Sequence, residues 1–192
     1  MSWNIDTAHT RANFAAKHMM IANVHGQFNK VSGMVDFNEK EPAKSTVDVQ
    51  IEAASIYTQE EKRDAHLKSA DFLEVEKYPY LTFKGKKVQV TSKNTGRITG
   101  DLTIKDITRE VVLDVEYNGQ GQSPWGSATT AGFSATTKIN RKDWGLTWNV
   151  ALETGGWLVS DEVKISIDAE IIKQAQAAPV AVEDAQISLA TA

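Results

Sequence analysis

Three of the four histidines in the chain, His9, His18 and His25, lie within one short stretch near its beginning. Imidazoles this close in sequence are candidates for a metal site or for acid–base catalysis. However, His9 and His18 are an odd number of positions apart, so an uninterrupted strand would place them on opposite faces. Zinc sites favour compact same-face spacings, such as two histidines four apart on a helix. We therefore predict no metal site.

The sequence also lacks the usual signatures of nucleophilic catalysis. It contains no cysteine and no Gly-x-Ser-x-Gly elbow. The carboxylates of its alternating segments fall on the face that should meet solvent: Asp48, Glu52, Asp114, Glu116, Asp168 and Glu170. We predict no catalytic residues and no cofactor.

The residues around these candidates alternate between apolar and polar, which is typical of strands that bury one face. In residues 45–53, for example, Val47, Val49 and Ile51 share one face while Asp48 and Gln50 share the other. The same period recurs at residues 81–83, 98–104, 111–117, 133–139 and 163–171. On this pattern His18 falls on the apolar side of its strand with Phe14, where it would line a cavity or brace its wall.

One segment, residues 58–80, breaks the alternation and predicts a single short helix. Thr58 and Glu61 form a capping-box pattern, and Pro79 forces the chain back to an extended conformation. Gly100 interrupts a predicted strand and indicates a bend or bulge. Residues 174–192 are rich in alanine and without strong period, so we predict one domain over residues 1–173 followed by a flexible tail.

Composition excludes several classes of partner. The formal net charge of the 192 residues is -4, and no block of Lys or Arg is present, which argues against nucleic acid. No apolar run approaches the ~20 residues of a membrane-spanning helix. The first residues resemble no secretory signal, so we expect a cytoplasmic protein, or a periplasmic one if the chain is a mature form.

Antiparallel strands with one apolar face close either as a two-sheet sandwich or as a barrel. Consecutive hairpins and a single helix favour the barrel, and eight strands make it wide enough for one apolar ligand. The small residues among the inward aromatic side chains would leave a channel. The alternative is a barrel filled by its own side chains that acts through its surface.

Several collinear motifs resemble the YceI family of polyisoprenoid-binding, lipocalin-like proteins. They are WNIDTAHTRANFAAKH, VHGQFNKVSGMVDFN, RDAHLKSADFLEVEKYPYLTFKG, GDLTIKDITREVVLDV, NRKDWGL and LVSDEVKISIDAEI, which together cover roughly residues 3–172. The resemblance implies an extended eight-stranded antiparallel β-barrel with one short helix near the opening. It also implies a homodimer that stores or carries a polyisoprenoid, isoprenoid quinone or polyprenyl pyrophosphate.

The predicted site combines an apolar cavity with a polar mouth. An enzyme acting on the same amphiphile through His18, or a stress-related interaction protein with a filled barrel, are the alternatives. We predict head-group contacts from His9, Arg11, Arg63, His66 and Arg141. The predicted cavity residues are Phe14, His18, Phe28, Val35, Phe37, Val49, Ile51, Phe83, Leu102, Ile104, Leu113 and Phe133.

Overall fold

The structure, a computed structural model, describes residues 3–123 and 128–173. The predicted tail, residues 174–192, lies outside the described residues. Strand segments of the described chain form one antiparallel sheet: β1 Trp3–Ile5, β2 Arg11–His18, β3 Ala22–Phe28, β4 Val31–Asp36, β5 Thr46–Glu52, β6 Ile56–Tyr57, β7 Tyr80–Val90, β8 Thr95–Ile104, β9 Ile107–Gln122, β10 Thr129–Asn140 and β11 Val159–Lys173.

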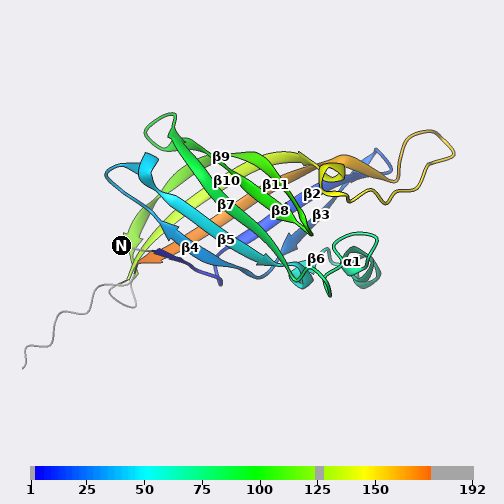
Figure 1. Cartoon of the computed structure of the whole chain (residues 1–192), viewed down its shortest axis with the longest axis horizontal. Helices are drawn as coiled ribbons and strands as arrows, with labels where there is room; N and C mark the ends of the chain where they lie inside the picture. The colour runs from blue at the N-terminus through cyan, green and yellow to red at the C-terminus, as the bar shows by residue number, and fades with distance from the viewer. Residues whose placement is uncertain (1–2, 124–127, 174–192) are drawn as a thin grey trace, which may run out of the picture.

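The sheet closes on itself because β1 pairs with both β4 and β11 (Figure 1). Three pairs of segments, β1 with β2, β3 with β4 and β5 with β6, are each two parts of one bent wall strand. The eleven segments less these three continuations make eight wall strands. The predicted all-β class and the eight-stranded antiparallel lipocalin-like barrel are therefore confirmed.

Alternation of side chains determines which face of each strand turns inward. In β9, Val111 and Leu113 are buried while the intervening Val112 is 44% exposed on the outer face. β9 and β11 are long strands of 16 and 15 residues, which give the barrel its elongated shape (Figure 1). A strand of this length spans roughly 50 Å at ~3.3 Å per residue.

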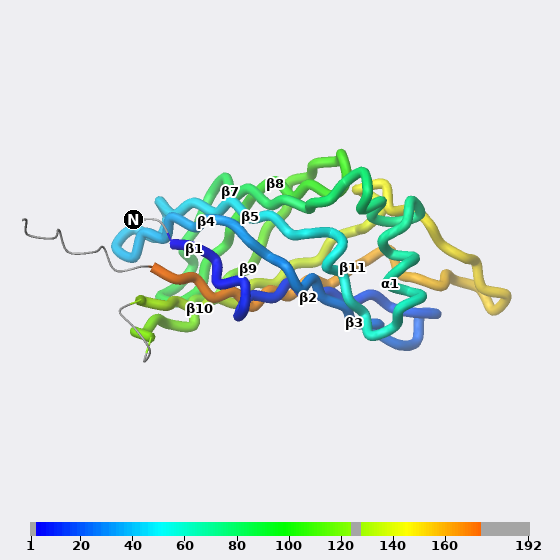
Figure 2. Tube along the Cα trace, turned by 90° about the horizontal axis from the view of Figure 1, so that it is seen from below, coloured from blue at the N-terminus to red at the C-terminus, as the bar shows by residue number. Residues whose placement is uncertain are grey.

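The two ends of the barrel carry different structures. The helix α1 (Glu61–Lys68) and the 145–158 loop lie at one end, whereas the β4–β5 loop and the β7–β8 hairpin lie at the other (Figures 1 and 2). Short 3-10 turns η1 (Pro42–Lys44), η2 (Ala53–Ser55) and η3 (Arg141–Trp144) connect strands. No helix of the described residues is long and apolar enough to cross a membrane.

The helix starts differently from the capping-box prediction. Its N-cap is Glu60, whose side chain accepts hydrogen bonds from the backbone N–H groups of Lys62 and Arg63 at 3.1 and 2.6 Å. Thr58 instead donates both its N–H and its hydroxyl to the buried Asp64 carboxylate. Because Thr58 is occupied by this tertiary contact, the next acidic side chain caps the helix.

Gly100 marks the irregularity predicted for its strand. It pairs with Gly85, and the register of β7 against β8 shifts immediately afterwards, between Gly85 and Lys87. A Cβ atom at Gly100 would lie 2.5 Å from the ring of Phe83. The missing side chain therefore lets Phe83 lie flat against the wall where the barrel bends.

Candidate functional site

An apolar cavity of about 610 Å³ runs through the barrel. Its wall is built from the inward faces of the strands, in which branched aliphatic and aromatic side chains alternate with outward polar ones. Eleven of the twelve predicted cavity residues line it: Phe14, Phe28, Val35, Phe37, Val49, Ile51, Phe83, Leu102, Ile104, Leu113 and Phe133.

The twelfth predicted cavity residue, His18, lies outside the cavity. It is the last residue of β2 and is exposed to solvent. The register of β11 against β2 shifts between Val163, which faces Ala16, and Val159, which faces His18. Ala16 is the last β2 residue that lines the cavity, so the simple alternation that placed His18 inside fails at this irregularity.

The cavity is most tightly packed toward the α1 end. Leu73, Trp144 and Leu146 are buried there, and the Trp144 indole Nε1 donates to the Leu102 carbonyl oxygen at 3.0 Å. Leu67 of α1 also packs against this cluster and lines the cavity. The helix therefore belongs to the packed end of the barrel.

The opposite end holds a cluster of aromatic rings beside an opening. The Phe37 ring lies 5.2 Å from that of Phe133 and 5.8 Å from those of Trp3 and Tyr117, measured between centroids. Burial, together with the nearby Glu39 carboxylate, raises the pKa of Tyr117. Val90 lines the same cavity yet is 49% exposed, so the interior reaches solvent here.

Polar side chains surround this opening, and we call them the rim: Glu39, Ser45, Ser92, Lys93, Asn94, Thr95, Arg97 and Gln120. Glu39 accepts hydrogen bonds from Gln120 and Lys173, both at 3.1 Å, and these bonds lower its pKa. Arg97 pairs with Asp114 at 2.9 Å. Lys93 makes no hydrogen bond or ion pair with the described part of the chain, which leaves its charge available at the opening.

The rim was missed by sequence reasoning. Ser92, Lys93 and Asn94 of the rim lie in the connection between β7 and β8. Nothing in a turn sequence says which hairpin borders an opening. The single predicted helix is present, and Leu67 of α1 lines the cavity from the end opposite this rim, which the β4–β5 loop and the β7–β8 hairpin border.

Of the five predicted head-group residues, only Arg141 lines the cavity, and its guanidinium is already occupied. Arg141 is 3% exposed and donates to the carbonyl oxygens of Ser160 at 3.0 Å, Trp148 at 2.9 Å and Leu146. Burial lowers its pKa, opposed by the Asp161 carboxylate 3.5 Å away. Arg141 therefore holds backbone in place.

The other four predicted head-group residues are held away from the cavity. Arg63 donates to the hydroxyl and carbonyl oxygens of Thr58 at 2.8 and 2.6 Å. His66 contacts Asp71 at 2.9 Å and stacks edge-on against Trp148. Arg11 donates to the carbonyl oxygen of Thr10 at 2.8 Å. His9 lies in the turn before β2.

His9 forms a surface cluster with two carboxylates. Its Nδ1 lies 2.7 Å from the Asp6 carboxylate and 3.9 Å from that of Glu170. The hydrogen bond and charge of Asp6 raise the pKa of His9, and the same bond lowers the pKa of Asp6. Because an ion pair accounts for this arrangement, we do not assign a metal to it, and the absence of a metal site stays a prediction.

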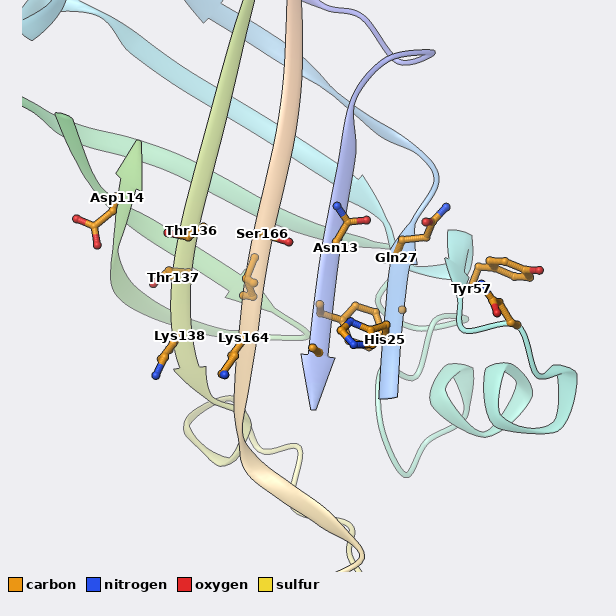
Figure 3. Close-up of a pocket in the computed structure, with 15 residues that line it drawn as sticks. Asn13, His25, Gln27, Tyr57, Asp114, Thr136, Thr137, Lys138, Lys164 and Ser166 are labelled. Atoms are coloured by element: carbon orange, nitrogen blue, oxygen red, sulfur yellow. The ribbon is translucent and has the colours of Figure 1, made fainter. Parts of the chain in front are cut away.

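A second concavity lies on the outside of the barrel. It has a volume of about 850 Å³ and crosses the outer faces of β10, β11, β2 and β3, with Tyr57 of β6 at its edge (Figure 3). Its labelled side chains are polar, in contrast to the cavity inside. We call it the outer groove.

The fold and the cavity together define a lipocalin-like barrel, a closed antiparallel wall around an apolar interior with a polar rim. A family model described as the YceI-like domain matches residues 3–171. The chain therefore belongs to the YceI-like domain family, as its motifs predicted.

Individual relatives agree with this membership. The UPF0312 protein SA2479 of Staphylococcus aureus (strain N315) is 37% identical over 171 residues, which cover 88% of this chain and 96% of the relative. A crystal structure of a Campylobacter jejuni YceI protein is 32% identical, with a TM-score of 0.71 over 83% of this chain and 90% of its own. A polyisoprenoid-binding domain from Saccharophagus degradans shares the fold, with a TM-score of 0.62 at 12% identity over 90% and 98% of the two chains.

Proposed function

We propose that this protein binds one long-chain amphiphile, a polyisoprenoid, isoprenoid quinone or polyprenyl pyrophosphate, and stores or carries it without converting it. The observation that carries the proposal is the cavity of about 610 Å³, which is lined mainly by aliphatic and aromatic side chains and opens at a polar rim. The Saccharophagus degradans neighbour is described as polyisoprenoid-binding, which supports the same class of ligand.

Burial of a chain is sufficient to hold such a ligand. At ~0.8 kcal/mol per CH₂, about ten methylenes contribute on the order of 8 kcal/mol before the costs of ordering. The apolar tail would lie among the aromatic and aliphatic side chains. The head group would stay at the rim, where Lys93 offers an unpaired cation and Asn94 an amide.

Binding is favoured over catalysis by the position of His18. The alternative enzyme would use His18 and a neighbouring acid as a base on the amphiphile. His18 lies outside the cavity, and its imidazole makes no hydrogen bond or ion pair with the residues that the structure describes. A base must come within hydrogen-bonding reach of the proton it removes, so this route has no geometric support.

The test is organic extraction and mass spectrometry of the purified full-length chain, beside native mass spectrometry of the unextracted sample. We expect one prenyl lipid per chain, or one-to-one uptake of added octaprenyl pyrophosphate. An empty protein that takes up no added prenyl lipid would contradict the proposal and favour a barrel that acts through its surface.

A matched pair of variants locates the lipid in the cavity. Val115→Trp places an indole on the cavity face of β9 and should reduce bound prenyl lipid at least tenfold. Val112→Trp, on the outer face of the same strand, should retain it. Val49→Phe on β5 is a second blocking variant should Val115→Trp fail to fold by circular dichroism. Equal lipid in all variants would place the lipid elsewhere.

Two further parts of the proposal concern the state of the protein. We propose a homodimer, which light scattering after gel filtration would detect as twice the mass of the chain. The cytoplasmic location stays a prediction, and fractionation of the producing cell against a periplasmic marker would decide it.

A further inference from the structure

The outer groove has a charge and a hydrogen-bonding pattern that fit a different ligand from the cavity. We propose that it binds a soluble anionic saccharide, with the anionic group on Lys138 and Lys164 and the sugar across β2 and β3. The groove lies on the outer face of the same wall whose inner face lines the cavity, and Asn13, Phe14, Thr137 and Ile165 border both spaces. The inference does not depend on the proposed lipid.

Strand register places the groove residues in two parallel rows. In one row Lys138 faces Lys164, Lys164 faces Ala15, and Ala15 faces His25 on four successive strands. Ala15 is the only short side chain of this row, so the groove is deepest between Lys164 and His25. The second row lies two residues along the same outer face and consists of Asp114, Thr136, Ser166, Asn13, Gln27 and Tyr57.

The first row carries positive charge that the described chain only partly neutralises. Lys138 and Lys164 face each other directly, an arrangement of like charges that destabilises a sheet. Glu162 lies 3.5 Å from Lys138, but Lys164 has no ion-pair partner among the described residues. The one acid in the groove, Asp114, is paired with Arg97 at 2.9 Å.

The positive charge of Lys138 and Lys164 is a local feature of the groove, since the formal net charge of the whole chain is -4. A phosphate or carboxylate placed between the two ammonium groups would relieve their repulsion and gain charge-assisted hydrogen bonds. The groove is thus suited to an anion although the protein is acidic.

The second row supplies the chemistry that recognises hydroxyl groups. Asn13 and Gln27 present side-chain amides, and Ser166 adds a hydroxyl. The Gln27 Nε2 already donates to Asn29 Oδ1 at 2.5 Å, so Gln27 offers mainly its carbonyl oxygen. The Asn13 side chain makes no hydrogen bond within the described residues, so both sides of its amide are available. Tyr57, 46% exposed at the edge of the groove, offers a flat face for the carbon side of a sugar ring.

The dimensions fit a sugar with one charged substituent. From Lys164 on β11 to His25 on β3 is two strand spacings, roughly 10 Å at ~4.8 Å each. A free phosphate would fill only the lysine end and leave the amides and Tyr57 unused. The arrangement therefore favours a sugar phosphate or a uronate over a simple anion.

The experiment titrates the full-length chain with glucose 6-phosphate, glucuronate, glucose and inorganic phosphate by calorimetry and by backbone amide shifts in NMR. We expect both anionic sugars to bind, with shifts confined to β2, β3, β10 and β11. Glucose and inorganic phosphate should each bind at least tenfold more weakly. Lack of binding of either anionic sugar at millimolar concentration would overturn the proposal.

Variants separate the two halves of the site. Lys164→Gln and Asn13→Ala should each weaken binding of glucose 6-phosphate about tenfold, and only the first should reduce its dependence on salt. Lys87→Gln, an exposed lysine on β7 outside the groove, is the matched control and should bind as the parent does. Equal affinity of Lys164→Gln and the parent, or equal affinity for inorganic phosphate and sugar phosphate, would refute the site.

Discussion

Arg141 illustrates how a residue chosen for its chemistry can serve the backbone instead. Its type and position favoured a head-group contact, but its Nε and Nη1 donate to carbonyl oxygens of the 145–158 loop and of the start of β11, and its Nη2 lies 3.5 Å from the Asp161 carboxylate without a hydrogen bond. A guanidinium presents five donors in a rigid fork, which suits it to hold several carbonyl oxygens together. These hydrogen bonds of Arg141 fix the 145–158 loop against the α1 end of the barrel.

At the residue scale we therefore predict a structural cost for Arg141→Leu. Loss of the fork leaves buried carbonyl oxygens without their donor and removes the guanidinium charge 3.5 Å from the Asp161 carboxylate, which should lower the free energy of unfolding by about 3 kcal/mol. Urea denaturation followed by tryptophan fluorescence measures this change in the free energy of unfolding. The control is Arg109→Leu, whose exposed guanidinium donates, within residues 3–123 and 128–173, only to the Thr108 carbonyl oxygen at 3.4 Å. A loss below about 1 kcal/mol for Arg141→Leu would contradict this role.

The β2–β3 hairpin is the element whose sequence fits its conformation least. Met19 and Met20 at its tip both have positive φ, 51° and 63°, and the N–H of Ile21 donates to the His18 carbonyl oxygen at 3.1 Å. Such a turn favours Asn-Gly, because side chains other than glycine are strained there. Both methionines are also largely exposed. Local turn preference did not determine this element.

At the element scale, replacing Met19-Met20 by Asn-Gly should stabilise the protein. Removal of two strained φ angles is expected to add about 2 kcal/mol to the free energy of unfolding. This corresponds to a rise of roughly 4–8 °C in Tm for a chain of this size. Thermal circular dichroism measures the change. Met34→Asn, an exposed methionine in an ordinary strand, should not produce it, and an unchanged or lower Tm in the double variant would refute the strain argument.

At the scale of the whole molecule, the cavity couples ligand binding to stability. A barrel that encloses its ligand presents that site only when the wall is closed, so the ligand binds the folded state alone. Such a ligand at a hundred times its Kd adds about 2.7 kcal/mol to the free energy of unfolding. Binding of the proposed lipid in the cavity should therefore stabilise the closed barrel as a whole.

We accordingly expect the lipid-free protein to unfold at a lower temperature than the loaded one, by roughly 5–10 °C. Calorimetry before and after extraction, followed by reloading with octaprenyl pyrophosphate, measures the difference. Val115→Trp should respond to neither treatment because its cavity is blocked. A Tm of the parent that is unaffected by removal and return of the lipid would contradict binding inside the wall.

The sequence by itself determined the strands, the inward faces of the wall and the presence of one helix between residues 58 and 80. These follow from alternation and local propensity, which depend only on neighbouring residues. For this reason the inward direction of residues such as Phe83 and Leu113, which line the cavity, could be predicted from position alone.

Only the tertiary structure decided which end of the barrel opens and which polar residues stand there. The rim is assembled from Glu39, Lys93 and Gln120, which lie far apart in sequence and meet because β1 closes the sheet against β11. The register shift between β11 and β2 left His18 outside the cavity, and the 145–158 loop and the start of β11 engage the buried Arg141. Alternation specifies which way a side chain points, but pairing between distant strands specifies what it meets, and that pairing is absent from the local pattern.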